Sequence, residues 1–150
     1  MNRRRFLQWS SIALAAVTTA SYSRFVEPHW LEVTTRTVTL KTPLTQPLRL
    51  LHLSDLHAST AVPLEYLATA IERSLLTQPD LICLTGDYIT QQILKPRRYQ
   101  RILQQLAASA PTFACLGNHD GGLWAEGHGG YADSAAVIDL LTTAGIHCLQ

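Results

Sequence analysis

Short apolar runs alternate with longer segments of helical periodicity over residues 48–149 of the chain. The apolar runs are too short for helices and are typical of strands buried in a sheet. The predicted strands cover residues 48–53, 81–85, 112–116 and 146–149. Between them, apolar side chains recur every three or four residues, which predicts helices over residues 63–77, 96–109 and 133–144. Asp133 and Gly145 would mark the start and the end of the last helix.

Strands that alternate with helices predict an α/β fold made of βαβ units, with a parallel sheet and right-handed crossover connections. The strand segments do not alternate strictly between apolar and polar residues, so we expect both faces of the sheet to be covered. A further strand is predicted over residues 32–40, where Val and Thr are frequent.

The first twenty residues differ from the rest of the chain. Arg3, Arg4 and Arg5 precede an apolar stretch from Trp9 to Ala20 that contains no acidic residue. This stretch is shorter than the roughly 20 apolar residues of a membrane span and fits the apolar region of an export signal. Its start resembles the twin-arginine pattern, and an ordinary secretory signal or an uncleaved membrane anchor is the alternative.

We therefore expect residues 1–20 to direct export to the periplasm or to the outer face of the cytoplasmic membrane. The same segment could associate the protein with the membrane in either of these two locations. Residues 21–47 are then a connector that contains the first predicted strand, and residues 48–150 form the main domain.

The composition excludes a disordered chain, since 47% of the 150 residues are hydrophobic and 15% are charged. The formal net charge of +1 gives no general field for polyanions. One basic cluster is more typical of a solvated helix face than of a nucleic-acid-binding surface, so we find no nucleic-acid signal. It consists of Lys95, Arg97, Arg98 and Arg101.

Three cysteines each lie within an apolar run and show no Cys-x-x-Cys spacing. We interpret them as buried small side chains, not as disulfide partners or metal ligands. They are Cys83, Cys115 and Cys148.

Polar side chains directly follow three of the predicted strands. Asp55 and His57 follow the first strand, Asp87 follows the second, and Asn118 and His119 follow the third. The carboxyl ends of parallel strands share one edge of a sheet, where ligands bind in open α/β folds. Carboxylate, amide and imidazole groups suit divalent Mn, Fe or Zn. In an extended chain Asp55 and His57 would point the same way and could hold one ion together.

Glycine precedes the polar residue at two of these strand ends, at Gly86 and Gly117. A residue without a Cβ permits a tight turn and a close approach of the backbone to a site.

Taken together, Asp55-x-His57, Gly86-Asp87 and Gly117-Asn118-His119-Asp120 resemble the calcineurin-like metallophosphoesterase family, and in particular its bacterial exported or membrane-associated phosphodiesterases. The resemblance covers residues 48–150 and implies the N-terminal half of an αββα sandwich with an incomplete sheet. It implies metal-dependent hydrolysis of phosphoric esters, with two divalent ions and a hydroxide that bridges them. The substrate would be a phosphoester, such as one linked to a lipid or a nucleotide.

The resemblance also implies a role for each motif residue. Asp55 and His57 would bind the first metal ion, Asp87 would bridge both ions, and Asn118 would bind the second. His119 would contact the phosphate and protonate the leaving oxygen without binding metal. Asp120 would orient His119 through a hydrogen bond.

The family completes its site with a later histidine and a Gly-His-x-His motif, and neither occurs in these 150 residues. We interpret His128 as a loop residue and His147 as a strand residue, not as substitute ligands. The alternative reading is therefore a truncated, non-catalytic remnant with partial metal binding. The 150 residues alone are expected to bind metal weakly and to hydrolyse little phosphoester.

The glycine-rich loop that follows Asp120 carries Trp124 and Tyr131. It is a candidate substrate-facing element, and a plain surface loop is the alternative.

Overall fold

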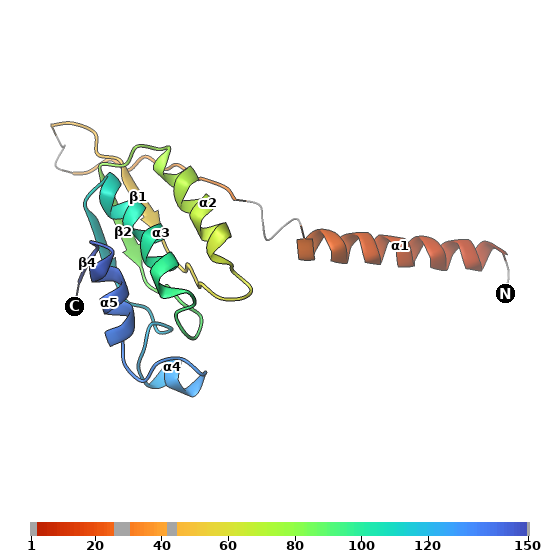
Figure 1. Ribbon diagram of the computed structural model, residues 1–150. Coiled ribbons are helices and arrows are strands. Elements are labelled where there is room, and N and C mark those ends of the chain that lie inside the picture. The colour runs from red at the N-terminus through yellow and green to blue at the C-terminus, as the bar shows by residue number, and fades with distance from the viewer. Residues whose placement is uncertain (1–2, 26–30, 42–44, 150) are drawn as a thin grey trace. The chain divides into compact units, whose positions relative to one another are not determined.

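The computed structural model describes residues 3–25, 31–41 and 45–149 (Figure 1). The chain divides into two compact units, residues 1–34 and residues 35–150. Helix α1 (Arg3–Phe25) belongs to the first unit, and its described side chains, such as Trp9, are exposed. Among the described residues, no helix is both long enough and apolar enough to span a membrane.

The second unit is built on a parallel sheet of four strands in the order β1-β2-β3-β4. The strands are β1 (Leu50–Leu53), β2 (Leu81–Thr85), β3 (Thr112–Cys115) and β4 (His147–Cys148). Leu51 pairs with Ile82, and Leu84 pairs with Ala114, so these residues share one face of the sheet. The predicted α/β class and parallel topology are confirmed.

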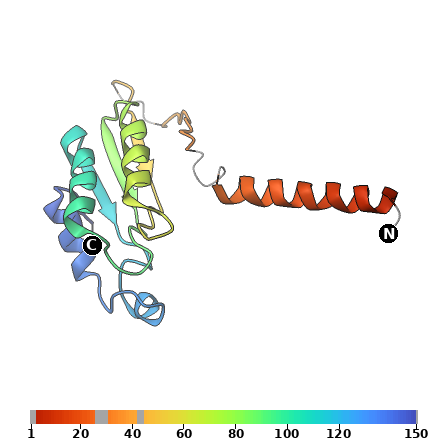
Figure 2. The same ribbon diagram turned by 45° about the vertical axis from the view of Figure 1, so that its right-hand side comes forward.

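Helices α2 (Leu64–Leu75), α3 (Pro96–Ser109) and α5 (Ala135–Thr143) lie on one face of this sheet (Figures 1 and 2). Right-handed crossovers between strands that follow one another in sequence place every connecting helix on the same side. The helices and the sheet bury a single apolar core between them. Its fully buried members include Ile71, Ile82, Leu84, Leu103, Leu106 and Leu141.

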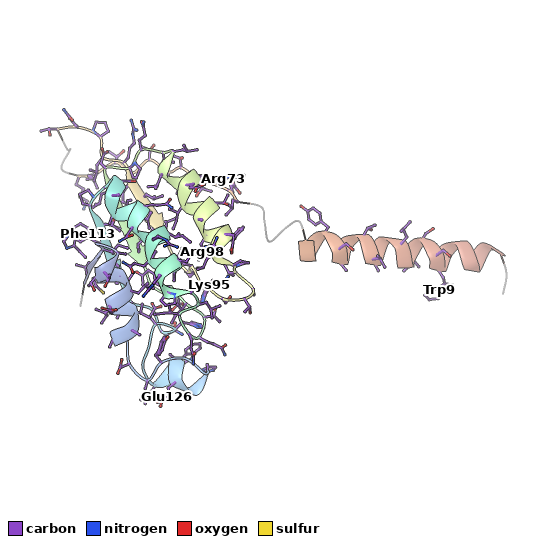
Figure 3. The ribbon with its side chains drawn as sticks, in the orientation of Figure 1. Trp9, Arg73, Lys95, Arg98, Phe113 and Glu126 are labelled. Atoms are coloured by element: carbon purple, nitrogen blue, oxygen red, sulfur yellow. The ribbon has the colours of Figure 1, made fainter. Side chains whose placement is uncertain are left out.

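The opposite face of the sheet is not covered by the described residues. This agrees with the half sandwich that the resemblance implied, whereas the strand pattern alone had predicted cover on both faces. Burial alternates along β2 and β3, with half-buried or exposed residues on this second face. Phe113, which Figure 3 labels at the sheet, stacks there on His147 with ring centroids 5.4 Å apart. Cys115 lies on the same face and is exposed, so its interpretation as a buried side chain is wrong. Cys83 and Cys148 are half-buried.

The predicted strand over residues 32–40 is absent, because these residues have no regular secondary structure and are exposed. Val and Thr favour a strand only where a neighbouring strand takes up the backbone hydrogen bonds, and no described residue pairs with this segment. The glycine-rich loop contains a short helix that the pattern did not predict, α4 (Leu123–Gly127). At the start of α5, Ser134 occupies the cap position, and the Asp133 carboxylate accepts a hydrogen bond from the Ala135 amide at 2.9 Å.

The basic residues of the predicted helix face lie on the outside of the helical layer, as Lys95 and Arg98 show in Figure 3. Arg98 pairs with Glu65 of α2 at 2.6 Å between Nη1 and Oε1. An exposed pair of this kind joins two neighbouring helices and adds little stability.

Candidate metal site at the carboxyl edge of the sheet

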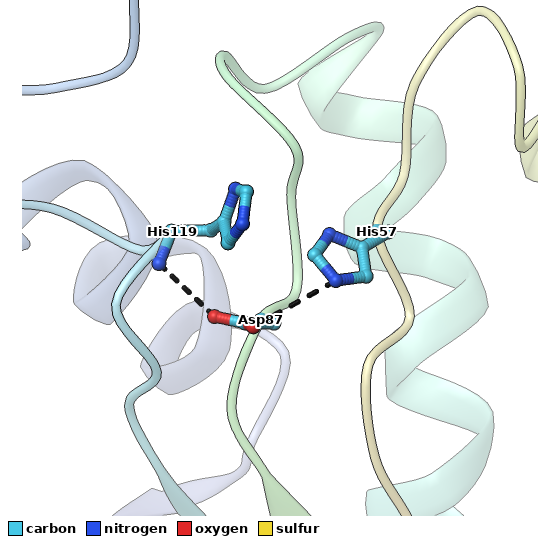
Figure 4. Close-up of side chains that lie close together, drawn as sticks. All are labelled: His57, Asp87 and His119. Atoms are coloured by element: carbon cyan, nitrogen blue, oxygen red, sulfur yellow. Dashed lines mark hydrogen bonds and ion pairs between the residues drawn. The ribbon is translucent and has the colours of Figure 1, made fainter. Parts of the chain in front are cut away.

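The loops after β1, β2 and β3 meet at one edge of the sheet. His57, Asp87 and His119 come from these three loops, and each offers a ligand atom within 4.8 Å of the others (Figure 4). Each of the three residues lies between a strand and the helical connection that follows it, which is where an open α/β sheet binds its ligands. The predicted convergence of the three strand ends is confirmed for these residues.

His57 lies between two carboxylates. Its Nε2 atom is 3.7 Å from Asp55 Oδ1 and 3.7 Å from Asp87 Oδ2. The other oxygen of Asp87 accepts a hydrogen bond from the His119 amide at 3.0 Å. Asp87 therefore contacts the loops on both sides of its own.

Three of the candidate ligands have a left-handed backbone. The φ angles are 55° at Asp55, 44° at His57 and 54° at Asp87. This conformation costs about 1–2 kcal/mol for a residue with a Cβ, although Asp and His adopt it more readily than most. Asp55 and His57 therefore do not lie in the extended chain that the sequence had predicted, since the chain has left the strand conformation before it reaches them.

Hydrogen bonds between the first two loops offset this backbone cost. The Asp55 amide donates to the Gly86 carbonyl at 3.2 Å, and the His57 amide donates to the Asp87 carbonyl at 2.8 Å. The Ser54 hydroxyl also donates to the Asp55 carboxylate. Asp55 keeps 63% of its side chain exposed, so its carboxylate is accessible at the rim of the site.

Gly86 and Gly117 allow the second and third loops to touch. A Cβ on Gly86 would lie 2.6 Å from the Gly117 nitrogen, and a Cβ on Gly117 would lie 2.2 Å from Asp87 Oδ1. Both distances are far below van der Waals contact, and Gly86 also has a φ of 79°. The predicted close approach of the backbone at these two glycines is confirmed.

Asp120 holds the same two loops together from inside the protein. Its carboxylate is fully buried and accepts hydrogen bonds from three backbone amides, those of Asp87, Tyr88 and Gly117, each at 2.8 Å. Burial raises the pKa of the Asp120 carboxyl above its ordinary value, and the three amide hydrogen bonds partly offset this rise.

The hydrogen bond from His119 to Asp120 that the resemblance implied is therefore absent, because the Asp120 oxygens face the amides of the neighbouring loops. The His119 Nδ1 atom lies 2.9 Å from the Thr90 carbonyl oxygen instead. A carbonyl only accepts, so Nδ1 carries the hydrogen and Nε2 is left for a ligand. Sequence reasoning missed Thr90, since no short motif links it to His119.

Two buried tyrosines bind, from the side of the core, the loop that follows β2. The Tyr88 hydroxyl donates to the Cys115 carbonyl at 2.9 Å, and the Tyr99 hydroxyl donates to the Tyr88 carbonyl at 2.8 Å. Burial raises the pKa of both phenols well above the ordinary value, so both remain protonated donors. The loop that carries Asp87 is thus fixed to the core by side chains that the motif does not include.

The remaining predicted residues lie as follows. Asn118 is exposed in the third loop, directly before His119. His147 lies on β4, on the face of the sheet away from the helices, and His128 stands outside the cluster of His57, Asp87 and His119. The donors that do converge are one carboxylate and two imidazoles, with the Asp55 carboxylate next to them, a set that fits Mn, Fe or Zn.

Comparison with known proteins agrees with this geometry. The sequence model of the calcineurin-like phosphoesterase family matches residues 48–149. Phosphodiesterase YaeI of Escherichia coli is 38% identical over 121 residues, which cover 80% of this chain and 45% of that protein. The uncharacterized metallophosphoesterase YkuE of Bacillus subtilis is 34% identical over 160 residues, which cover 97% of this chain and 51% of that protein.

A third relative is the UDP-2,3-diacylglucosamine pyrophosphatase LpxG of Chlamydia trachomatis, which is 32% identical over 114 residues. The match covers 74% of this chain and 35% of LpxG. This chain thus spans about half the length, or less, of the curated relatives it matches.

Proposed function

Because this chain belongs to the calcineurin-like phosphoesterase family, we propose that it forms the metal-binding edge of a hydrolase that cleaves phosphodiester or pyrophosphate bonds. The observation that carries the proposal is the convergence of His57, Asp87 and His119 from three separate loops. Such a cluster of imidazoles and a carboxylate at the carboxyl ends of parallel strands suits a phosphoester bound through divalent ions.

Asp55, His57, Asp87 and Asn118 would hold two divalent ions, with Asp87 between them. When bound, these ions supply charge neutralisation of the phosphate and activation of a nucleophilic water. Asp87 is suited to the central position because its two carboxylate oxygens face the loops on either side. Hydrogen bonds among the loops hold the backbone of Asp55, His57 and Asp87.

His119 would act on the phosphoester itself. Its Nδ1 hydrogen is held by the Thr90 carbonyl, so the ring presents Nε2 in a fixed direction. In its doubly protonated form, with a second hydrogen on Nε2, the ring can donate a hydrogen bond to a phosphate oxygen and pass the Nε2 proton to the leaving oxygen as the phosphorus–oxygen bond breaks. The water oxygen becomes part of the phosphate product, and the proton lost by the water replaces the one that Nε2 gave up.

The names of the relatives support a phosphodiester or pyrophosphate substrate. YaeI is named a phosphodiesterase, and LpxG is named a pyrophosphatase of UDP-2,3-diacylglucosamine. We extend the proposal to a substrate in which the phosphate carries a lipid or a nucleoside. Export through residues 1–20 belongs to the same proposal, and Arg3→Lys with Arg4→Lys should retain the chain in the cytoplasm if the twin-arginine pattern is used.

The experiment measures phosphate binding to this chain with and without Mn²⁺, by equilibrium dialysis. We expect phosphate to bind only in the presence of the metal. Asp87→Ala should lose both Mn²⁺ and phosphate, whereas Asp80→Asn, at the other end of the sheet, should lose neither. Phosphate binding that is independent of Mn²⁺ and of Asp87 would contradict the proposal. Hydrolysis of bis(p-nitrophenyl) phosphate that requires both would assign turnover to this chain.

A further inference from the structure

Three aromatic rings form a row that leads away from the site. The ring of His119 lies 4.3 Å from that of Trp124, at an interplanar angle of 63°. Trp124 in turn stacks on His128, with centroids 4.1 Å apart and an angle of 19°. The row begins at the metal site itself, because His119 also meets the ring of His57 edge-on at 4.7 Å.

Hydrogen bonds fix the part of the glycine-rich loop that carries this row. His128 Nδ1 lies 2.7 Å from the Trp124 carbonyl oxygen, which ties the outer two rings to each other. The Gln91 side chain donates to the His128 carbonyl at 2.9 Å and joins the row to the loop after β2. Ala125 is 2% exposed and accepts a hydrogen bond from the Gly130 amide at 2.8 Å. The indole is thus held in a defined place beside His119.

Trp124 nevertheless keeps much of its surface free. Its exposed fraction is 43%, although it packs against two imidazoles. An exposed indole next to a polar site is unusual, because a large aromatic side chain gains free energy when it is covered. The free surface lies on the loop that directly follows the Asn-His-Asp sequence of the site.

We propose that Trp124 contacts the group that leaves with the ester oxygen and that it selects for a planar, aromatic leaving group. The inference rests on the proposed function, in which His119 protonates the leaving oxygen. Since Trp124 touches the ring of His119, a group attached to that oxygen lies beside the indole. His128 already covers one face of the indole, so a flat leaving group would contact the exposed remainder of Trp124. Aromatic rings favour offset stacking in such contacts.

The test compares phenyl phosphate with methyl phosphate and butyl phosphate as ligands of this chain in Mn²⁺, by isothermal titration calorimetry. Stacking should make phenyl phosphate bind roughly fivefold more tightly than methyl phosphate. Trp124→Ala should remove this preference, so that phenyl phosphate and methyl phosphate bind with the same affinity, whereas Trp124→Phe should keep most of the preference. Leu123→Ala is the matched control, because Leu123 is the neighbouring apolar residue and is 89% exposed.

Three results would overturn the inference. Trp124→Ala could weaken phenyl and methyl phosphate equally, which would make the indole a support for His119 only. Butyl phosphate could bind as tightly as phenyl phosphate and lose this affinity in Trp124→Ala. That result would indicate an apolar contact for an alkyl or acyl chain. Failure of methyl phosphate to bind in Mn²⁺, or its unchanged binding in Asp87→Ala, would refute the proposed function itself, and this inference with it.

Discussion

Asp120 offers the sharpest test of how the site is built, because one buried carboxylate joins two of its loops. Oδ2 accepts from the amides of Asp87 and Gly117, and Oδ1 accepts from the amide of Tyr88. In Asp120→Asn the remaining oxygen can keep the first two hydrogen bonds, but the new NH₂ group faces the Tyr88 amide, which is also a donor. A hydrogen bond to a charged group is worth about 1.5–3 kcal/mol, so we expect the free energy of unfolding to fall by about 2–3 kcal/mol.

The assay is urea denaturation, followed by measurement of the Mn²⁺ dissociation constant at a urea concentration where the variant is folded. Residues that orient metal ligands typically contribute about tenfold or more to metal affinity, and Asp120 holds the backbone of Asp87. We therefore expect Mn²⁺ to bind Asp120→Asn about tenfold more weakly than the wild type.

Asp80→Asn is the matched control for this change. The Asp80 carboxylate also accepts a hydrogen bond from a backbone amide, that of Arg49 at 2.8 Å, but it is exposed and lies at the opposite end of β2. Asp80→Asn should lower the free energy of unfolding by less than about 1 kcal/mol and leave Mn²⁺ affinity unchanged. The reasoning is refuted if Asp120→Asn is as stable as Asp80→Asn, or if it binds Mn²⁺ as tightly as the wild type.

Three further predictions concern the loops and their supports. Gly117→Ala should abolish Mn²⁺ binding, because the added Cβ would lie 2.2 Å from Asp87 Oδ1. Gly127→Ala is the control: its added Cβ would have no atom within 4 Å, so this variant should bind Mn²⁺ normally. His119→Ala should lower phosphate affinity at least about tenfold, because it removes a hydrogen bond to a charged group, and should retain Mn²⁺ in metal analysis; loss of the metal would instead make His119 a ligand. Tyr99→Phe removes a buried 2.8 Å hydrogen bond to the carbonyl of Tyr88; it should lower the free energy of unfolding by about 1 kcal/mol in urea denaturation and weaken Mn²⁺ binding less than Asp120→Asn does.

Local periodicity predicted the regular elements of the main unit well. The strand over residues 81–85 and the helix over residues 96–109 have the predicted bounds, because each carries its full pattern within its own sequence. The prediction of a strand over residues 32–40 was wrong for the opposite reason, since a strand depends on a neighbouring strand that the local sequence does not reveal.

The sequence was enough to identify residues of the candidate site but not their hydrogen bonds. The motifs pointed to Asp87 and His119, and the parallel topology predicted that they lie close together. The partners of Asp120 and His119 were not predictable, because a carboxylate can bind any nearby donor and the amides of another loop compete with a neighbouring imidazole. The stack on Trp124 likewise depends on how the glycine-rich loop folds back, which no repeat or periodic pattern in the sequence encodes.

The central claim is that loops from three strands form a single metal site. Mn²⁺ binding to the wild type, His57→Ala and Asp87→Ala, measured by calorimetry with Asp80→Asn as the control, tests it most directly. We expect each of the first two substitutions to weaken binding by at least about tenfold, since each removes a ligand from a different loop. If both variants bind Mn²⁺ as tightly as the wild type, the site is not where the three strand ends meet.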